Sequence, residues 1–375
     1  MSRPPLAFVH DHIVQRGGGE RVLLAMTRAF PATPVYTSFY RPELTFPEFA
    51  NLDVRPMPAD RVGVLRKHHR AALPIFPLLY NRLHVDADVV ICSSSGWAQG
   101  ARVGGRKLIF FQALAQWLHA SEHYLANVGP AARWGVATLR PWLTRWDRRT
   151  VETADRLAVC GGHMRDLVRQ AYGMDAEIVP PPIAVDPSGP QSPIDGVEPG
   201  FFMTASRLLT QKHVDAVIGA FHELPGERLI VAGDGPERDR LAASAPRNVT
   251  FLGNAGDEQL RWLYAHARAL VSAAAEPYGL TPAEAASFGT PTVAIDEGGL
   301  RDSVIEGETG WRFATREPQV VAAAVRRAVN ESIDRAGLDA LARRHTPEVF
   351  QRRLRELVAE LGATPPSPPS RASTG

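Results

Sequence analysis

Cysteine is scarce in this chain, which contains only Cys92 and Cys160 among 375 residues. Each of them ends or follows an apolar run that is typical of a strand, which predicts small buried side chains and argues against a disulfide framework. We therefore expect the protein to work in a reducing compartment.

Long hydrophobic runs are also lacking. No stretch approaches the roughly 18 consecutive apolar residues that a membrane-spanning helix needs. The apolar run at residues 6–9 is far shorter than the core of a signal peptide. These absences predict a cytoplasmic protein that is neither exported through an N-terminal signal nor embedded in a membrane.

An excess of charge of one sign is the third missing feature. The 42 Lys and Arg residues nearly balance the 40 Asp and Glu residues, and no nucleic-acid-binding motif is present, so we expect no nucleic acid as partner. Two basic clusters stand out, at residues 61–84 and 133–149. Both suit peripheral contact with the inner face of an anionic membrane. A solvated helix face is the alternative for the first cluster, and a partner protein or a polyanionic acceptor is the alternative for the second.

The sequence does contain a repeated alternation of strand and helix patterns. Short apolar runs that end in glycine- or serine-rich turns recur along the chain, which is typical of buried parallel strands. The alternation begins again after a run rich in proline and glycine. We therefore predict an α/β protein with two Rossmann-like parallel-sheet domains, at residues 1–186 and 201–345, joined by a linker at residues 187–200.

A glycine triplet follows the first predicted strand, at Gly17, Gly18 and Gly19. A helical pattern begins directly after it, so backbone amides at the helix start can reach a phosphate or a sugar. A glycine triplet is a weak signal by itself, and a plain tight turn is the alternative.

The stretch at residues 276–284 carries two carboxylates around a predicted turn from strand to helix. Thr281 suits the N-cap of that helix, Pro282 its first position and Glu284 its third, where the carboxylate completes a capping box. Capping alone is the alternative to a binding role for Glu284.

The other carboxylate of this stretch belongs to the loop. Pro277 biases Glu276 toward an extended backbone, so the two acids do not share a helix face. Gly279 permits either a close approach of the backbone to a ligand or a positive φ. Free amides near the helix start then form an anion-binding end.

Two cations, Arg207 and Lys212, follow the first predicted strand of the second domain. Ligands of α/β proteins bind where strands end, so these side chains are candidates for holding a phosphate.

These features together resemble the retaining glycosyltransferases of family 4, also called group 1, which have the GT-B fold. The resemblance lies in the two carboxylates separated by seven residues, in the two cations and in the glycine-rich opening, and it follows the order of motifs over residues 6–361. It implies two Rossmann-like domains that face each other across a cleft, and a last helix at residues 346–362 that crosses back to the first domain. The Pro- and Ser-rich tail at residues 363–375 is expected to be disordered.

The resemblance also implies roles for particular residues. In the family the matching cations hold the donor diphosphate, the first carboxylate binds sugar hydroxyls and the second binds the ribose. Catalytic roles are thereby implied for Arg207, Lys212, Glu276 and Glu284. Donor contacts are implied for Gly17, Gly18, Gly279, Leu280 and Thr281, and acceptor-side positions for Asp11 and Gln112.

The chain departs from the family's pattern at two places. Ser206 stands where a glycine is usual. Gln112, Leu114 and Gln116 stand where many members have His, Pro and Arg. Gln112 can donate and accept hydrogen bonds but cannot carry a proton, so the role of that position is open.

The resemblance implies metal-independent transfer, with retention of configuration, of a hexose from a nucleoside-diphosphate sugar to a carbohydrate or lipid-linked acceptor, in the synthesis of a polysaccharide or glycoconjugate. The order of motifs is most similar to that of bacterial mannosyltransferases, which favours GDP-mannose as the donor. No cofactor and no metal site are expected. Two alternatives stay open: a catalytically inert nucleotide-sugar-binding partner of another transferase, and a sugar-nucleotide epimerase with the same fold.

Overall fold

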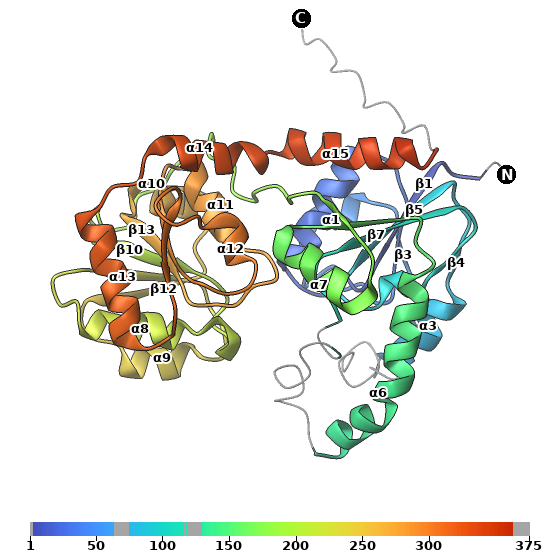
Figure 1. Ribbon diagram of the computed structural model, residues 1–375, viewed down its shortest axis with the longest axis horizontal. Coiled ribbons are helices and arrows are strands. Elements are labelled where there is room, and N and C mark those ends of the chain that lie inside the picture. Colours follow the sequence, from blue (N-terminus) through green and yellow to red (C-terminus); the bar gives the residue numbers. More distant parts are fainter. Residues whose placement is uncertain (1–2, 64–74, 116–117, 119–129, 363–375) are drawn as a thin grey trace, which may run out of the picture. The chain divides into compact units, whose positions relative to one another are not determined.

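The computed structural model describes residues 3–63, 75–115, 118 and 130–362. The chain divides into two compact units (Figure 1). The N-terminal unit comprises residues 1–180 and 350–375, and the C-terminal unit comprises residues 181–349. Each unit has its own sheet and its own hydrophobic core. The tail at residues 363–375, for which the sequence predicts disorder, lies outside the described residues.

A seven-stranded parallel sheet forms the centre of the N-terminal unit. Its inner strands are continuous apolar runs, and every residue of the strands Leu6–His10 and Val89–Ser94 is buried. Such runs are needed because a parallel sheet is covered on both faces. In spatial order the strands are β3 (Val54–Pro56), β2 (Val35–Thr37), β1 (Leu6–His10), β5 (Val89–Ser94), β7 (Arg106–Phe111), β8 (Arg156–Val159) and β9 (Glu177–Ile178).

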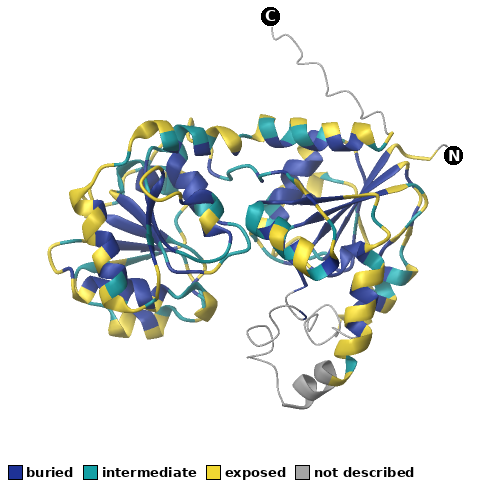
Figure 2. Cartoon of the chain, viewed as in Figure 1, coloured by how far each residue is buried: buried dark blue, intermediate teal, exposed yellow. Residues whose placement is uncertain are grey.

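The described helices of this unit are α1 (Gly18–Ala29), α3 (Phe76–Arg82), α6 (Pro130–Val151), α7 (Gly162–Tyr172) and α15 (Pro347–Glu360), and a small second sheet pairs β4 (His84–Val85) with β6 (Arg102–Val103). The helices carry both buried and exposed residues (Figure 2), and those of α1 and α15 contribute buried apolar residues to the core of the sheet.

The helix α15 is distant in sequence from the rest of this unit. Phe350 and Leu354 are fully buried in the core cluster that contains Leu23 of α1. Arg355 Nε also donates to the carbonyl of Ala29 over 3.2 Å. The apolar face of α15 therefore completes the core of the N-terminal unit.

A six-stranded parallel sheet forms the centre of the C-terminal unit. In spatial order its strands are β12 (Val249–Gly253), β11 (Leu229–Ala232), β10 (Phe202–Ala205), β13 (Ala269–Ser272), β14 (Thr292–Ile295) and β15 (Gly310–Phe313). The helices of this unit are α8 (Val214–His222), α9 (Arg238–Ser244), α10 (Asp257–His266), α11 (Leu280–Ser287), α12 (Leu300–Ser303), α13 (Pro318–Asn330) and α14 (Arg335–Arg344).

The run at residues 187–200, which the sequence predicts to be a linker, packs within the C-terminal unit. Ile194 and Val197 lie against the core cluster that contains Trp262 of α10. Ser192 N donates to the carbonyl of Glu258 over 3.1 Å. The two apolar residues give the run a hydrophobic anchor that its proline and glycine content does not reveal, and the chain changes unit between residues 180 and 181 instead.

Each sheet has one point at which the direction of its connections reverses. From β1 the chain proceeds to β2 and β3 on one side, and the later strands begin with β5 on the other side. In the C-terminal unit the same reversal lies between β10 and β13. Ligands of open α/β sheets bind outside the carboxyl ends of the strands at such switch points.

The two cysteines are buried and free, as the sequence predicts. None of the described helices combines the length with the apolar character that a membrane span requires.

Candidate functional site

The switch point of the C-terminal unit brings together a cation and a carboxylate that are distant in sequence. Lys212 follows β10, and Glu276 follows the adjacent strand β13. Lys212 Nζ forms an ion pair with Glu276 Oε1, and the two side chains retain 21% and 28% exposure. Two predicted site residues therefore meet at the sheet edge where a ligand is expected, and both remain accessible.

The loop that carries Arg207 and Lys212 packs against a glycine turn. Leu208 is buried, and its N–H donates to the carbonyl of Asp234 over 2.9 Å. Gly233 has φ +135°, and a Cβ added there would lie 1.9 Å from the carbonyl oxygen of Ser206. Only glycine is compatible with this approach. Arg207, between Ser206 and Leu208, is exposed at the same loop.

Gly233 is a site residue beyond those that the sequence pattern predicts. The sequence feature that marks Gly233 is the Gly-Asp-Gly motif at residues 233–235. The same motif also suggests dinucleotide binding. A Cβ on Gly235 would lie 2.3 Å from the carbonyl oxygen of Leu208. Both glycines thus serve to position the loop after β10.

The loop after β13 is held by the next glycine turn. Gly299 N donates to the carbonyl of Glu276 over 2.7 Å. Gly298 has φ +60°, and a Cβ there would lie 2.6 Å from the same carbonyl oxygen. The backbone of Glu276 is therefore fixed while its side chain points to Lys212.

One of the two options predicted for Gly279, a positive φ, is not used in the structure. Its φ is −89°, so it does not use the left-handed region. A Cβ on Gly279 would lie 2.5 Å from Leu300 Cδ2. Packing against α12 is therefore a reason for glycine at this position, independently of any approach by a ligand.

The predicted capping box is wrong. The helix α11 begins at Leu280, with Gly279 at the N-cap and no side-chain cap. Glu284 is only 7% exposed, and its carboxylate accepts from Tyr264 OH over 2.9 Å and from Ala184 N over 3.2 Å. A buried carboxylate requires donors, and these tertiary partners supply them in place of the local amide.

The helix start still offers donors at the sheet edge. Leu280 and Thr281 belong to the first turn of α11, and Pro282 has no N–H. The first amides of a helix have no partner within the helix, so they can face an anion. The predicted donor contacts of Leu280 and Thr281 are compatible with this placement.

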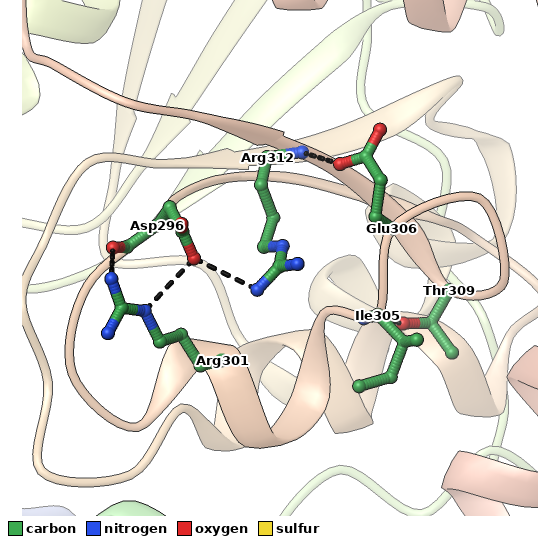
Figure 3. Close-up of polar contacts among 6 residues, drawn as sticks. All are labelled: Asp296, Arg301, Ile305, Glu306, Thr309 and Arg312. Carbon is green, nitrogen blue, oxygen red and sulfur yellow. Dashed lines mark hydrogen bonds and ion pairs between the residues drawn. The ribbon is translucent and has the colours of Figure 1, made fainter.

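Arginines neutralise the carboxylates after β14. Asp296 Oδ1 accepts from Arg301 Nε over 3.0 Å and from Arg312 Nη1 over 2.9 Å (Figure 3). Arg316 forms a bidentate pair with Glu297, with a shorter contact of 2.5 Å, and its Nε donates to the carbonyl of Ala273 over 3.0 Å. Arg316 thereby joins the loops after β13 and β14.

In the N-terminal unit, Asp11 lies at the other switch point. Its carboxylate accepts from Ser95 N, Trp97 N and Ala98 N over 2.7, 3.2 and 2.6 Å. Burial raises the pKa of Asp11 to about 6, against the effect of these amide bonds. The side chain is only 3% exposed. Asp11, predicted to be on the acceptor side, therefore has a structural role in holding the turn after β5.

Gln112 joins the glycine-rich helix start to the sheet. It follows β7, and its Nε2 donates to the carbonyl of Gly19 over 3.0 Å and to Ser93 Oγ over 2.5 Å. Ser93 Oγ also lies 3.1 Å from His10 Nδ1. Burial lowers the pKa of His10 to about 4, so this ring is neutral near pH 7.

The glycines at the start of α1 differ in their surroundings. Gly17 is the N-cap, and a Cβ there would lie 2.6 Å from Glu20 Oε2. A Cβ on Gly18 would meet no heavy atom of the described chain within 4 Å. The helix start at Gly18 is therefore open to a ligand.

The basic clusters are only partly at the surface. Residues 64–74 of the first cluster lie outside the described residues. The second belongs to α6, where Trp142 is 41% exposed but Trp146 is 7% exposed and donates from Nε1 to Asn81 Oδ1 over 2.9 Å. Trp146 is thus a core residue and not part of the exposed surface of this cluster.

No group of three or more His, Cys, Asp and Glu side chains suited to a metal ion occurs among the described residues.

The C-terminal unit matches a known family model. Residues 191–345 match the model of the family described as glycosyl transferases group 1. A glycogen synthase of Mycobacterium tuberculosis (strain CDC 1551 / Oshkosh) is 31% identical over 231 residues, which are 57% of this chain and 54% of that protein. A D-inositol 3-phosphate glycosyltransferase of Mycobacterium bovis (strain BCG / Pasteur 1173P2) is 32% identical over 227 residues, 52% and 46% of the two chains. The chain spans about half the length of these curated relatives.

A solved structure shares the fold over almost the whole length. The crystal structure of Anabaena Alr3699/HepE in complex with UDP-glucose matches with a TM-score of 0.70, covering 95% of this chain and 99% of that one, at 16% sequence identity. The predicted architecture of two Rossmann-like parallel sheets, the GT-B fold, is confirmed.

Proposed function

We propose that this chain is a glycosyltransferase that moves a sugar from a nucleoside-diphosphate sugar to an acceptor. The observation that carries the proposal is the accessible pair of Lys212 and Glu276 at the switch point of the second sheet. Both residues lie outside the strand ends where this fold class binds ligands. The match of residues 191–345 to the group 1 glycosyl transferases covers the same unit and supports the same function.

The chemical task is to stabilise a departing diphosphate while positive charge develops on the sugar. Lys212 and Arg207 supply cations for the leaving group, and the first amides of α11 supply a partial positive charge. Two charge-assisted contacts contribute roughly 3 to 6 kcal/mol, whereas enzymes lower barriers by roughly 8 to 23 kcal/mol. Alignment of donor with acceptor must therefore supply much of the remainder.

The ion pair itself suggests how Glu276 takes part. Without a donor, the carboxylate of Glu276 is held by Lys212. A bound diphosphate is a stronger partner for the ammonium because it carries more negative charge. Glu276 is then released to accept hydrogen bonds from sugar hydroxyls.

Glu284 is the proposed ribose contact. Its carboxylate already accepts two hydrogen bonds, from Tyr264 and Ala184. A carboxylate has about four acceptor positions, so a further hydroxyl can be accommodated. The two protein donors would hold Glu284 in one orientation for that contact.

The finer features follow from the resemblance to family 4. We propose that transfer proceeds with retention of configuration, without a metal ion, and that the sugar is a hexose. GDP-mannose is one candidate donor. UDP-glucose is another, since it is the ligand named for the similar Anabaena structure. A carbohydrate or lipid-linked acceptor is proposed.

A panel of donors tests the function. Purified full-length protein is incubated with UDP-glucose or GDP-mannose and sugar acceptors, and released nucleoside diphosphate and the anomeric configuration of the product are measured. We expect turnover with one donor, and a loss of about 100-fold or more in Lys212→Ala, because removal of a single transition-state contact often has this size. The control is Arg240→Ala, which removes an exposed cation paired with Glu237. Equal turnover in wild type and Lys212→Ala would refute the assignment.

One observation favours a second function, that of an inert nucleotide-sugar-binding partner. At the position where many family members have a histidine, the amide of Gln112 is already bonded to Gly19 and Ser93. Tight binding of a donor without hydrolysis or transfer on any acceptor would support this alternative.

A further inference from the structure

A cavity of about 550 Å³ lies in the N-terminal unit. One wall comes from β6 and the start of β7, and the other from the C-terminal half of α6. Lys107, which lines it, is the second residue of β7, whereas Gln112 follows the last. At about 3.3 Å per residue, the five steps between them span about 17 Å. The cavity is therefore near the amino end of β7, away from the carboxyl edge at which Asp11 and Gln112 lie.

The charge of the lining has one sign. Four cations line the cavity, and among the residues that the structure describes no carboxylate does. The cations are Arg102, Lys107, Arg145 and Arg149. Arg145 and Arg149 are four residues apart on α6, so they share one face of that helix. Side chains from a strand and a helix thus converge on one space.

The three arginines take part in no ion pair found within the described residues. Neighbouring carboxylates are engaged elsewhere. Asp155 accepts from Arg106 Nη1 over 2.6 Å and from Lys107 N over 2.8 Å. Glu152 pairs with Arg148 over 3.3 Å. Without an anion, no carboxylate among the described lining residues balances this positive charge.

Asp147 also lies close to Arg145 and Arg149 in sequence, but its side chain is buried. Its carboxylate accepts from Gln99 Nε2 over 2.8 Å and from Tyr172 OH over 2.7 Å, and it is 1% exposed. These bonds hold α6 to the turn at Ala98–Gly100 and to the end of α7.

Lys107 is the buried cation of the lining. Lys107 is 5% exposed, and its Nζ donates to the carbonyl of Gln99 over 3.0 Å and to Thr153 Oγ1 over 2.8 Å. An ammonium has three donors, so one is left for a ligand. A cation fixed in this way loses little conformational freedom on binding.

An aromatic surface completes the wall. Trp142 lines the cavity and is 41% exposed, while Trp146 beside it is held by Asn81. An exposed indole offers a flat apolar face as well as one N–H donor. The combination suits a ligand with both an anionic group and a ring.

We propose that this cavity binds a phosphate ester of a small sugar, with the phosphate among Arg102, Arg145 and Arg149 and the ring against Trp142. Guanidinium groups match phosphate oxygens in geometry and charge. The volume is within the range of small-molecule sites. This site is additional to the proposed donor site in the C-terminal unit.

Calorimetry on full-length protein tests the proposal, with mannose 6-phosphate and ribose 5-phosphate as probes and the free sugars as neutral controls. The Lys212→Ala variant serves as background, so that binding at the proposed donor site is removed. We expect saturable binding of a sugar phosphate but not of the free sugars. Arg149→Ala should weaken it about tenfold or more, since a charge-assisted hydrogen bond is lost.

Arg148→Ala is the matched control, because Arg148 is adjacent in α6 but pairs with Glu152 and does not line the cavity. The affinity of Arg148→Ala for the sugar phosphate should stay within about twofold of that of the background variant, as expected for an exposed cation that does not contact the ligand. Equal losses in Arg148→Ala and Arg149→Ala would overturn the proposal. Trp142→Phe should abolish any fluorescence change on binding, and an unaltered change would place the ligand elsewhere.

Anionic lipid headgroups carry the same phosphate chemistry, so phosphatidylglycerol vesicles form a separate arm. Sugar phosphates that bind in the absence of vesicles support the proposal. If the protein bound the vesicles but neither soluble sugar phosphate, the cavity would be a site for lipid headgroups. That result would refute the proposal.

Discussion

The hydroxyl of Tyr278 is hydrogen-bonded to Nε2 of the buried His345. Nδ1 of His345 lies 2.8 Å from the carbonyl of Leu341, and a carbonyl only accepts, so Nδ1 carries the proton and Nε2 accepts from the tyrosine. The carbonyl of His345 accepts from Ile183 N over 2.9 Å. The loop that begins with Glu276 is thereby tied to the end of α14 and to the first residues of the C-terminal unit.

This pair predicts a dependence of stability on pH. Burial lowers the pKa of His345 below its usual value of 6.5. The folded protein therefore keeps the ring neutral, whereas the unfolded chain binds a proton below about pH 6.5. The stabilisation is present above that pH and is lost as pH falls from there through the folded pKa. The melting temperature of wild type should fall more steeply on acidification than that of His345→Gln.

Tyr278→Phe is the control for that measurement. It removes one hydrogen bond, worth about 1 kcal/mol, but leaves the ring of His345 buried, so most of the pH dependence of wild type should remain. An identical slope in His345→Gln and wild type would contradict the prediction.

The buried carboxylate of Glu284 predicts a loss of stability that is separate from any role in binding. Glu284→Ala leaves Tyr264 OH and Ala184 N without their acceptor, which costs about 2 kcal/mol or more in the free energy of unfolding. Urea denaturation measures this change. Glu258→Ala, which alters an exposed acid of α10, should change stability by about 1 kcal/mol at most. Similar losses in the two variants would contradict the inferred partners of Glu284.

Gly233 should tolerate no side chain. In Gly233→Ala the Cβ meets the carbonyl of Ser206, and the positive φ is strained as well, so we expect a loss of about 1 to 3 kcal/mol or more. Gly226→Ala is the matched control, since a Cβ there meets no described atom within 4 Å. Thermal unfolding compares the two. The affinity for the nucleotide-sugar donor should also fall in Gly233→Ala. An unchanged affinity would show that the turn at Gly233 does not contribute to the donor site.

Chelation of metal ions should leave the rate unaltered. Arg207, Lys212 and the first amides of α11 are proposed to balance the charge of the leaving diphosphate, so no divalent cation is required for it. The rate of nucleoside-diphosphate release is measured before and after treatment with EDTA and dialysis. A lasting loss that only added metal restores would contradict metal independence.

The local pattern of apolar runs and turn residues was sufficient to predict the α/β class, the two sheets and the free buried cysteines. It also placed Arg207, Lys212 and Glu276 at strand ends. Buried parallel strands are continuous apolar runs, and their carboxyl ends share one sheet edge, so residues after neighbouring strands come together whatever their separation in sequence.

The tertiary structure decided the features that depend on partners far along the chain. Glu284 suits a capping box by spacing, yet its carboxylate is held by Tyr264 and Ala184. Gly279 packs on Leu300, and the run at residues 187–200 packs on the C-terminal unit. The basic cavity combines residues of β6, β7 and α6 that no single segment displays. Side-chain partners are selected by three-dimensional packing, and a buried polar group takes whichever donor that packing brings within reach.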